Sequence, residues 1–385
     1  MDLRSLPSNL DSVNRCKKRR KIIEKELEVD LSLLEVNKKT IGNADEKNCE
    51  QMFGQVPIPI GLAGPLKITL SDGNKTTVHL PIATTEGALV ASVNRGCKAL
   101  ANADSVQTSS VYHGISRSIA FKVHDKVHDF LSNIHKTKND WRKIAEETSN
   151  HLKLMKYDVD QSENYVYLTI YADTENAMGM NMITIAAESV GNWLEDSTNA
   201  ELITIAGNID SDKKPSKIVK ERGRGFEATA KVTIDANIIS NILNTTPEKL
   251  MSVADAKLNH GSKVAGAVSA NLHAANVIAA LYLATGQDVA HTVEGSLAET
   301  IVTMDGGSLN IKTRVPAILV GTIGGGTQLP AQRQCLDMLI KECENMPKRQ
   351  YLAEVIAASV LAGEISLLAA QATQSLANAH KDLGR

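Results

Sequence analysis

VAGAVSANLHAANVIAALYLA, residues 264–284, is a long stretch that is apolar on almost every face of a helix. A helix that is apolar all round is either buried in a large protein or spans a membrane. The run is interrupted by four polar residues: Ser269, Asn271, His273 and Asn276. Polar interruptions favour a buried helix of a soluble protein over a membrane-spanning helix. We therefore expect residues 264–284 to form the long central helix of a large domain.

An acidic residue follows the end of this predicted helix. Gly286 is suited to the left-handed position just after a helix, and Gln287 and Asp288 come next. The helix dipole opposes a carboxylate at this end, so Asp288 calls for a compensating cation such as a lysine. Asp288 is therefore a candidate functional residue.

The stretch AGNIDSDKKP, residues 206–215, supplies candidate cations in Lys213 and Lys214. A lysine with a carboxylate partner, held out of bulk water, can polarise a carbonyl oxygen and stabilise the negative charge that develops there. The alternative is an ordinary solvated charged loop. The stretch alone does not separate the two interpretations.

A second candidate acid, Glu86, lies in ATTEGALVASVNRGCKALANA, residues 83–103. The apolar spacing predicts one helix, capped by Thr84 or Thr85, with Glu86 in its first turn. A carboxylate there either stabilises the helix dipole or faces a cleft as a functional acid.

Residues 120–205 have the character of a separate unit. Tyr165–Ala172 alternates polar and apolar residues and predicts a strand. A turn then leads into AMGMNMITIAAESVGNWL, residues 177–194, a helix that opens with Gly and Met. Such a helix start suits a cofactor phosphate, although the GxGxxG spacing of dinucleotide-binding folds is absent. The alternative for the methionines is a place in the core.

A glycine-rich loop, VGTIGGGT at residues 320–327, follows an apolar strand predicted over Val315–Val320. Three consecutive glycines permit positive φ and close approach of the backbone to a dinucleotide. Further along, an Ala- and Leu-rich helix predicted over 351–380 ends in LANAH, with His380 as its last residue. Neither feature identifies a function on its own.

Composition limits the class of protein. The chain has 385 residues, a formal net charge of −2 and 43% hydrophobic residues, which indicate a multidomain globular protein with no nucleic-acid or membrane partner. The five cysteines show no CxxC spacing, so neither a metal site nor a disulfide framework is indicated. With a polar N-terminus and no apolar segment after its basic run, we expect a cytoplasmic protein without a membrane anchor.

Taken together, these stretches resemble hydroxymethylglutaryl-coenzyme A (HMG-CoA) reductase, in particular its class I branch in the soluble form of archaea and bacteria. The matching motifs stand in the order of that family: VPIPIGLAGPL (56–66), TTEGALVASVNRGCKAL (84–100), NAMGMNM (176–182), AGNIDSDKKP (206–215), LATGQD (283–288), GTIGGGT (321–327), LAGEISLLAAQ (361–371) and LANAH (376–380).

The resemblance implies roles for particular residues. It implies four catalytic residues: Glu86, Lys213, Asp288 and His380. It implies that HMG-CoA is bound by Arg117, Lys214, Lys257 and Asn276. It implies that the nicotinamide cofactor is bound by Asn176, Gly179, Met180, Asn181, Gly324 and Gly325. The family commonly has Asp where Asn176 stands.

The implied reaction is the reduction of (S)-HMG-CoA to (R)-mevalonate and CoA with two NADPH, in the mevalonate pathway of isoprenoid biosynthesis. NADH is the alternative cofactor, and no metal takes part. Lys213 would stabilise the former carbonyl oxygen, Asp288 would keep Lys213 protonated, Glu86 would act as general acid, and His380 would protonate the leaving thiolate.

The implied fold is an α+β multidomain architecture. A helical region covers residues 1–49, and a large HMG-CoA-binding domain around a long central helix covers 50–118 and 206–385. A small inserted α/β, ferredoxin-like NAD(P)-binding domain covers 119–205. The partner is a second copy, in a homodimer or a dimer of dimers with active sites at the subunit interface.

Two other functions stay open at this stage. One is NAD-dependent oxidation of mevalonate, against which the class I motifs argue. The other is a catalytically silent homologue that binds CoA derivatives or nucleotides.

Overall fold

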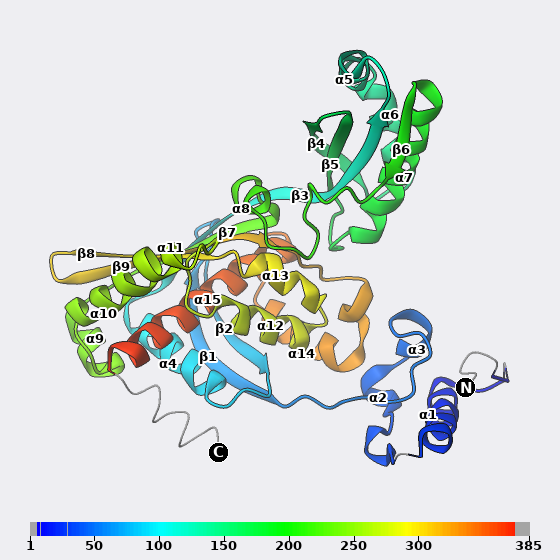
Figure 1. Cartoon of the computed structure of the whole chain (residues 1–385). Helices are drawn as coiled ribbons and strands as arrows, with labels where there is room; N and C mark the ends of the chain where they lie inside the picture. Colours follow the sequence, from blue (N-terminus) through cyan, green and yellow to red (C-terminus); the bar gives the residue numbers. More distant parts are fainter. Residues whose placement is uncertain (1–5, 8, 29, 374–385) are drawn as a thin grey trace.

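A computed structural model gives the fold, and it describes residues 6–7, 9–28 and 30–373. In these residues the strands are β1 (Ile60–Thr69), β2 (Lys75–Ala83), β3 (Val106–Val123), β4 (Lys153–Ser162), β5 (Tyr165–Asp173), β6 (Ala200–Thr204), β7 (Arg224–Ile234), β8 (Glu299–Asp305) and β9 (Ser308–Ile318). They form one mixed sheet in the order β2-β1-β3-β7-β9-β8, with β5 and β6 paired to β3 and β4 to β5 (Figure 1). The mixed α/β class expected from the sequence is confirmed.

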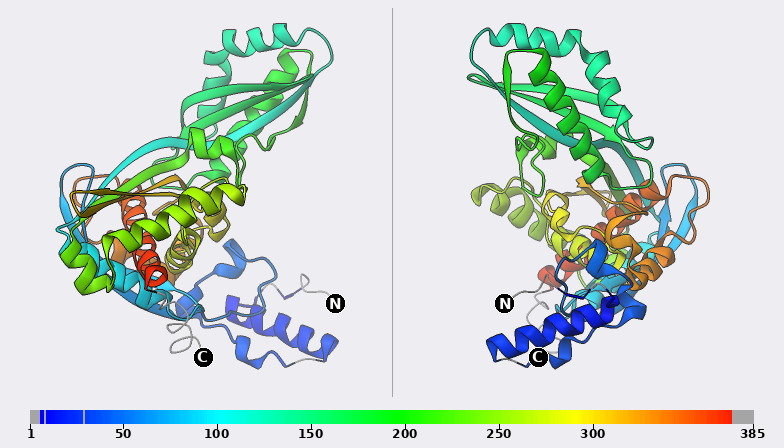
Figure 2. Two further views of the ribbon diagram at one scale, coloured as in Figure 1. Left: turned by 60° about the vertical axis from the view of Figure 1, so that its left-hand side comes forward. Right: turned by 90° about the vertical axis from the view of Figure 1, so that its right-hand side faces the viewer.

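The long strand β3 connects two hydrophobic cores. Its residues 107–114 pair with β7, and its residues 115–122 pair with β5. The first core lies where β1, β2, β7 and β9 meet the central helices. The second lies between β4–β6 and the helices α5 (Val127–Lys136), α6 (Lys138–Glu147) and α7 (Met180–Ser197). Figure 2 shows that this second group projects away from the rest of the molecule.

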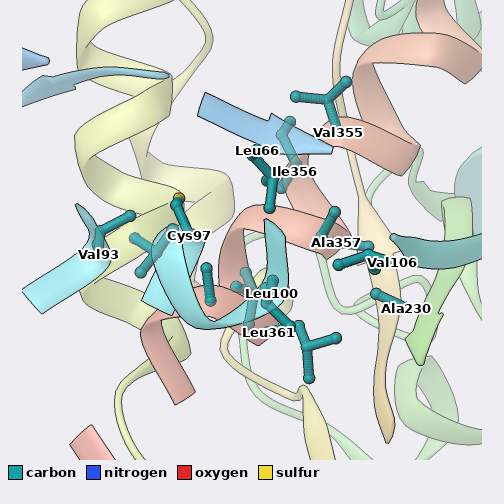
Figure 3. Close-up of a cluster of buried hydrophobic side chains, with 14 of the residues drawn as sticks. Leu66, Val93, Cys97, Leu100, Val106, Ala230, Val355, Ile356, Ala357 and Leu361 are labelled. Carbon is teal, nitrogen blue, oxygen red and sulfur yellow. The ribbon is translucent and has the colours of Figure 1, made fainter. Parts of the chain in front are cut away.

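The central helix of the first core is α15 (Lys348–Ala372), which is buried along nearly its whole length. Its small residues let other elements approach closely; a side chain at Gly96 of α4 (Leu89–Asn102) would strike the backbone at Ala362. Figure 3 shows Cys97 and Leu100 of α4 gathered with residues of α15 in this core. By length and composition α15 could cross a membrane, but 94% of its apolar window is buried inside the protein.

The expectation of one central helix over residues 264–284 is wrong. Only α12 (Ala274–Thr285) is regular there, and Gly266 has a left-handed φ of 65°. The backbone N–H groups of Leu272 and His273 donate to the buried carboxylate of Glu364 on α15, at 2.7 and 2.8 Å. Asn271 meanwhile donates to the carbonyls of Ser296 and Ala298. These bonds to other elements replace the helical bonds that would join 264–273 to α12.

The chain contains thirteen further helical segments among the described residues. They are α1 (Ser12–Leu27), η1 (Ser32–Leu34), α2 (Lys38–Ile41), α3 (Ala44–Lys47), α8 (Lys217–Arg222), α9 (Ala236–Leu243), α10 (Pro247–Ala254), η2 (Asp255–Gly261), α11 (Ser262–Val264), η3 (Val289–His291), α13 (Thr292–Gly295), η4 (Gly325–Gln328) and α14 (Pro330–Ile340). The helices expected near the N-terminus are α1–α3, which lie apart from the sheet and contact the rest of the chain at α14 (Figure 1).

Candidate active site

A cavity of about 490 Å³ lies where three segments distant in sequence meet. One is the turn and first residues of α7, at 177–182; another is the end of α12 and the residues after it, at 286–289; the third is the glycine loop at 321–327. Six of the residues predicted as functional line it: Gly179, Met180, Asn181, Asp288, Gly324 and Gly325.

Backbone contacts hold the cavity walls together. Ala177 and Ile323 form a parallel bridge, and the N–H of Thr322 donates to the carbonyl of Asn176 at 2.8 Å. The side-chain amide of Gln287 bonds Gly321 in both directions, at 2.9 and 3.0 Å. Asn176 therefore contributes through its backbone to the wall; its own side chain is exposed and does not line the cavity.

The cavity presents backbone to a ligand. Gly324 and Gly325 have positive φ, and a Cβ at either would meet nothing within 4 Å. Helix α7 starts at Met180, and Met180, Asn181 and Met182 of its first turn line the cavity. A helix N-terminus beside an open glycine loop is suited to the phosphates of a nucleotide.

Lys213 and Asp288 are in direct contact. Lys213 Nζ lies 2.7 Å from Asp288 Oδ2, and the two side chains are 41% and 37% exposed. Asp288 follows Gly286, which takes the left-handed position after α12 as the sequence predicted, and it caps η3 by accepting from Ala290 N. Burial raises the pKa of Asp288, but the bond from Lys213 and the neighbouring His291 outweigh that effect and hold it below its usual value. Asp288 is thus an ionised partner for the lysine at neutral pH.

A cluster of buried charged residues holds the backbone of Lys213. The backbone N–H of Lys213, at φ 58°, donates to Glu294 Oε1 at 2.7 Å. The same oxygen accepts from Arg224 Nη1 at 2.8 Å and lies 3.1 Å from His291 Nδ1. All three of these partner residues are almost fully buried. The position of Lys213 is therefore set by a rigid, charged interior.

Arg117 joins the same cluster through the aspartates that precede the lysine. Its Nη1 lies 3.2 Å from Asp212 Oδ2 and 3.5 Å from Asp210 Oδ2. Burial raises the pKa of Asp210 in spite of the nearby arginines. For Asp212 burial acts in the same direction, but Arg224 and its other cationic neighbours prevail and lower the pKa. Arg117 can bind an anionic group of a substrate only by giving up its contacts with Asp210 and Asp212.

Asp212, His291 and Glu294 offer ligand atoms close enough together to hold a metal ion. Arg224 Nη1, however, lies 3.0 Å from Asp212 Oδ1 and 2.8 Å from Glu294 Oε1. The guanidinium supplies the positive charge that a metal would bring.

Glu86 lies elsewhere, and its predicted setting is wrong. Helix α4 begins only at Leu89, after Ala88 in a left-handed conformation, so Glu86 precedes the helix and neither Thr84 nor Thr85 caps it. Thr84 Oγ1 instead accepts from the backbone N–H of Glu86, at 3.0 Å. Within the described part of the chain, the exposed Glu86 carboxylate has no hydrogen-bond or ion-pair partner and does not line the cavity.

The other predicted substrate residues are not gathered at this cavity. Lys214 donates to the carbonyl of Asp212 at 3.0 Å and is exposed. Lys257 lies in η2, and Asn276 lies in α12 with its amide 3.5 Å from His273 Nδ1. His380 lies outside the described residues.

Four residues that sequence reasoning missed contribute to the site: Arg224, Gln287, His291 and Glu294. Gln287 could have been found, because it stands between the two residues singled out at the helix end. Arg224, His291 and Glu294 gave no signal, because residues of these types are mostly exposed to solvent. Only the folded chain shows that they are buried together.

Comparison with known proteins gives a consistent result. Residues 15–385 match the family model described as hydroxymethylglutaryl-coenzyme A reductase. The 3-hydroxy-3-methylglutaryl-coenzyme A reductase of Haloferax volcanii is 39% identical over 397 residues, covering 100% of this chain and 96% of that protein. The enzyme of the same name from Methanothermobacter thermautotrophicus is 38% identical over 372 residues, covering 95% and 92%.

The fold has a solved counterpart as well. The class II 3-hydroxy-3-methylglutaryl-CoA reductase from Streptococcus pneumoniae, bound to NADPH in open conformations, superposes with a TM-score of 0.70. It is 19% identical and covers 92% of this chain and 96% of its own. At that identity the likeness concerns the fold.

Proposed function

Since the chain belongs to the hydroxymethylglutaryl-coenzyme A reductase family, we propose that it reduces HMG-CoA to mevalonate and CoA with two NADPH. The observation that carries this proposal is the contact of Lys213 with Asp288, a residue that lines a cavity built from the α7 start and the glycine loop. The reaction needs a cation where a carbonyl becomes an oxyanion, beside a nucleotide site, and this arrangement provides both.

The chemistry follows from the properties of these residues. The bound cofactor supplies a hydride in each of two rounds. The first converts the thioester to a hemithioacetal oxyanion, which Lys213 stabilises as a compact cation. Collapse of the hemithioacetal expels the CoA thiolate, which takes a proton from His380. In the second round Lys213 again holds the oxygen, and Glu86 supplies the proton that completes the alcohol.

The substrate contacts belong to the same proposal. Arg117, Lys214, Lys257 and Asn276 bind HMG-CoA, and Gly179, Met180, Asn181, Gly324 and Gly325 bind the nucleotide, with Asn176 in the supporting wall. Residues 119–205 form the cofactor domain, inserted between the two parts of the substrate domain. From the DKK, MGMNM and GTIGGGT motifs we also propose that the enzyme belongs to the class I branch. Free cysteines throughout the described chain fit a reducing cytoplasm.

The coupled assay of CoA release with nucleotide oxidation tests this function. We expect NADPH to give the higher kcat/KM when both cofactors are compared under matched conditions. A higher kcat/KM with NADH would make the cofactor assignment wrong. No reaction with HMG-CoA at all would favour a silent CoA-binding homologue, and release of CoA without nucleotide oxidation would show cleavage of the thioester without reduction.

We further propose that the active site is completed by a second copy of the chain. Four exposed apolar residues stand at alternate positions before and in β1: Val56, Ile58, Ile60 and Leu62. An apolar stripe of this kind marks an interaction surface. Glu86 and Lys213 do not meet within one chain, so a site that uses both takes them from two subunits of a homodimer, alone or paired into a tetramer.

Mixing two inactive variants tests the shared site. Glu86→Gln and Lys213→Ala homodimers each lack one group at both sites. After mixing and subunit exchange, half of the dimers carry one variant of each kind, and each of these has one intact site. We expect recovery of about a quarter of wild-type activity. No recovery after exchange, confirmed by native mass spectrometry, would show that both groups act within one chain.

A further inference from the structure

His291 is a fully buried histidine that lies between the catalytic pair and the charge cluster beneath it. Its Nδ1 lies 3.1 Å from Glu294 Oε1, and its Nε2 lies 3.7 Å from Asp288 Oδ2. Within the described residues Nε2 is buried without a hydrogen-bond partner. Asp288 Oδ2 is the same oxygen that contacts Lys213 Nζ at 2.7 Å.

Glu294 fixes one side of the imidazole ring. Its Oε1 already accepts from the backbone of Lys213 and from Arg224, so this oxygen is an acceptor, and Nδ1 must carry the hydrogen of the third contact. The orientation of the ring then directs Nε2 toward the carboxylate of Asp288. At 3.7 Å from Asp288 Oδ2, Nε2 lies beyond hydrogen-bond distance, but a hydrogen on Nε2 faces the carboxylate with favourable polarity, whereas a lone pair faces it unfavourably.

We propose that His291 is a positioning residue that presents Nε2–H to Asp288 and holds this carboxylate against Lys213 during both reductions. Glu294 is then a common support: it fixes the backbone of Lys213 on one side and the ring of His291 on the other. The inference rests on the proposed function, because it concerns the lysine that this function requires. His291 does not line the cavity and touches neither substrate nor cofactor.

The charges around the ring agree with this role. Facing it are Asp288 and Glu294 on neighbouring turns and Asp212 Oδ1 at 3.9 Å from Nδ1. Arg224 pairs with both Glu294 and Asp212. Three carboxylates therefore surround the ring, and a positive edge of the ring is favourable toward each of them.

Two amide variants separate the two nitrogens. The amide nitrogen of Gln occupies roughly the place of Nε2, and that of Asn roughly the place of Nδ1. We expect His291→Asn, which keeps the contact with Glu294 but loses that with Asp288, to lower kcat about 10- to 100-fold, as small misplacements of a reacting group do. His291→Gln should stay within about threefold of wild type, because it can still donate to Asp288. KM for NADPH should change in neither.

The pH profile gives a readout that a purely structural role would not move. His291 is among the causes that lower the pKa of Asp288. Its loss in His291→Asn should raise that pKa, so the acid limb of the kcat profile should move to higher pH. In His291→Gln the acid limb of the kcat profile should stay closer to that of wild type. His124→Asn is the matched control, because His124 forms an exposed pair with Glu201 at 3.1 Å.

Several outcomes would overturn the inference. Folded His291→Asn with the kcat and the acid limb of wild type would show that the contact with Asp288 does not support catalysis. A loss of kcat in His291→Gln as large as that in His291→Asn would show the same. Should His291→Asn not fold, His291→Met, which fills the space with an apolar side chain, makes the same comparison. Wild type and Lys213→Ala test the proposed function itself. An inactive wild type refutes both the function and this inference. An active wild type with unaffected His291 variants refutes the inference alone.

Discussion

Lys213→Ala is expected to lower kcat for HMG-CoA reduction by about 10²–10³-fold or more, the loss seen when a donor to a developing oxyanion is removed. Each hydride transfer leaves negative charge on the former carbonyl oxygen, and Lys213 is the cation in contact with Asp288, which lines the cavity. The fold should survive, because the structural contact of this residue is its backbone N–H to Glu294, which alanine retains.

The controls for this variant come from the same loop. Lys217→Ala removes an exposed lysine that pairs with Glu221, and it should leave kcat unchanged. Lys213→Arg should not restore activity, because a planar guanidinium cannot replace a compact ammonium in contact with one oxygen. Near-normal kcat in Lys213→Ala would refute the role of this residue.

Arg224→Met is expected to destabilise the protein by about 3–5 kcal/mol, the usual cost of removing one partner from a buried charge cluster. The guanidinium is almost fully buried and bonds Ser116, Asp212 and Glu294. Without it, Glu294 and Asp212 remain as buried carboxylates without their main cation. The measurement is the thermal unfolding midpoint.

Arg222→Met is the matched control for this stability prediction. Arg222 stands two positions earlier and contacts Asp160 at 2.8 Å, but a third of its side chain is exposed. Partly exposed pairs of this kind contribute about 0–1 kcal/mol. If the two variants shift the unfolding midpoint equally, the cluster below Lys213 is not the rigid support described here.

Local features were the part of the fold that the sequence predicted well. Gly286 ends α12 in the left-handed conformation, and the carboxylate after it does have a lysine partner, because the dipole argument depends only on neighbouring residues. The strand expected at Tyr165–Ala172 is β5, although burial alternates only over its first four residues, since Thr169 and Tyr171 are buried too. Features set by one or two turns of chain are open to prediction from sequence.

Features that depend on contacts between distant segments were not predicted. Residues 264–273 have an apolar helical pattern, yet Glu364, far along the chain, takes the N–H groups of Leu272 and His273. Glu86 has a suitable position for a first turn, but the backbone at Ala88 turns left-handed before α4 starts. The buried contacts of Arg224 with the segment that holds His291 and Glu294 join parts of the chain about 70 residues apart, and no spacing in the sequence encodes them.

The central claim is tested most directly by the ratio of nucleotide oxidised to CoA released when purified protein reacts with HMG-CoA and NADPH. Reduction of the thioester to the alcohol at the Lys213 site predicts two NADPH oxidised for each CoA released, with mevalonate as product. A ratio of one, with an aldehyde as the end product, or CoA release without NADPH oxidation would contradict the account.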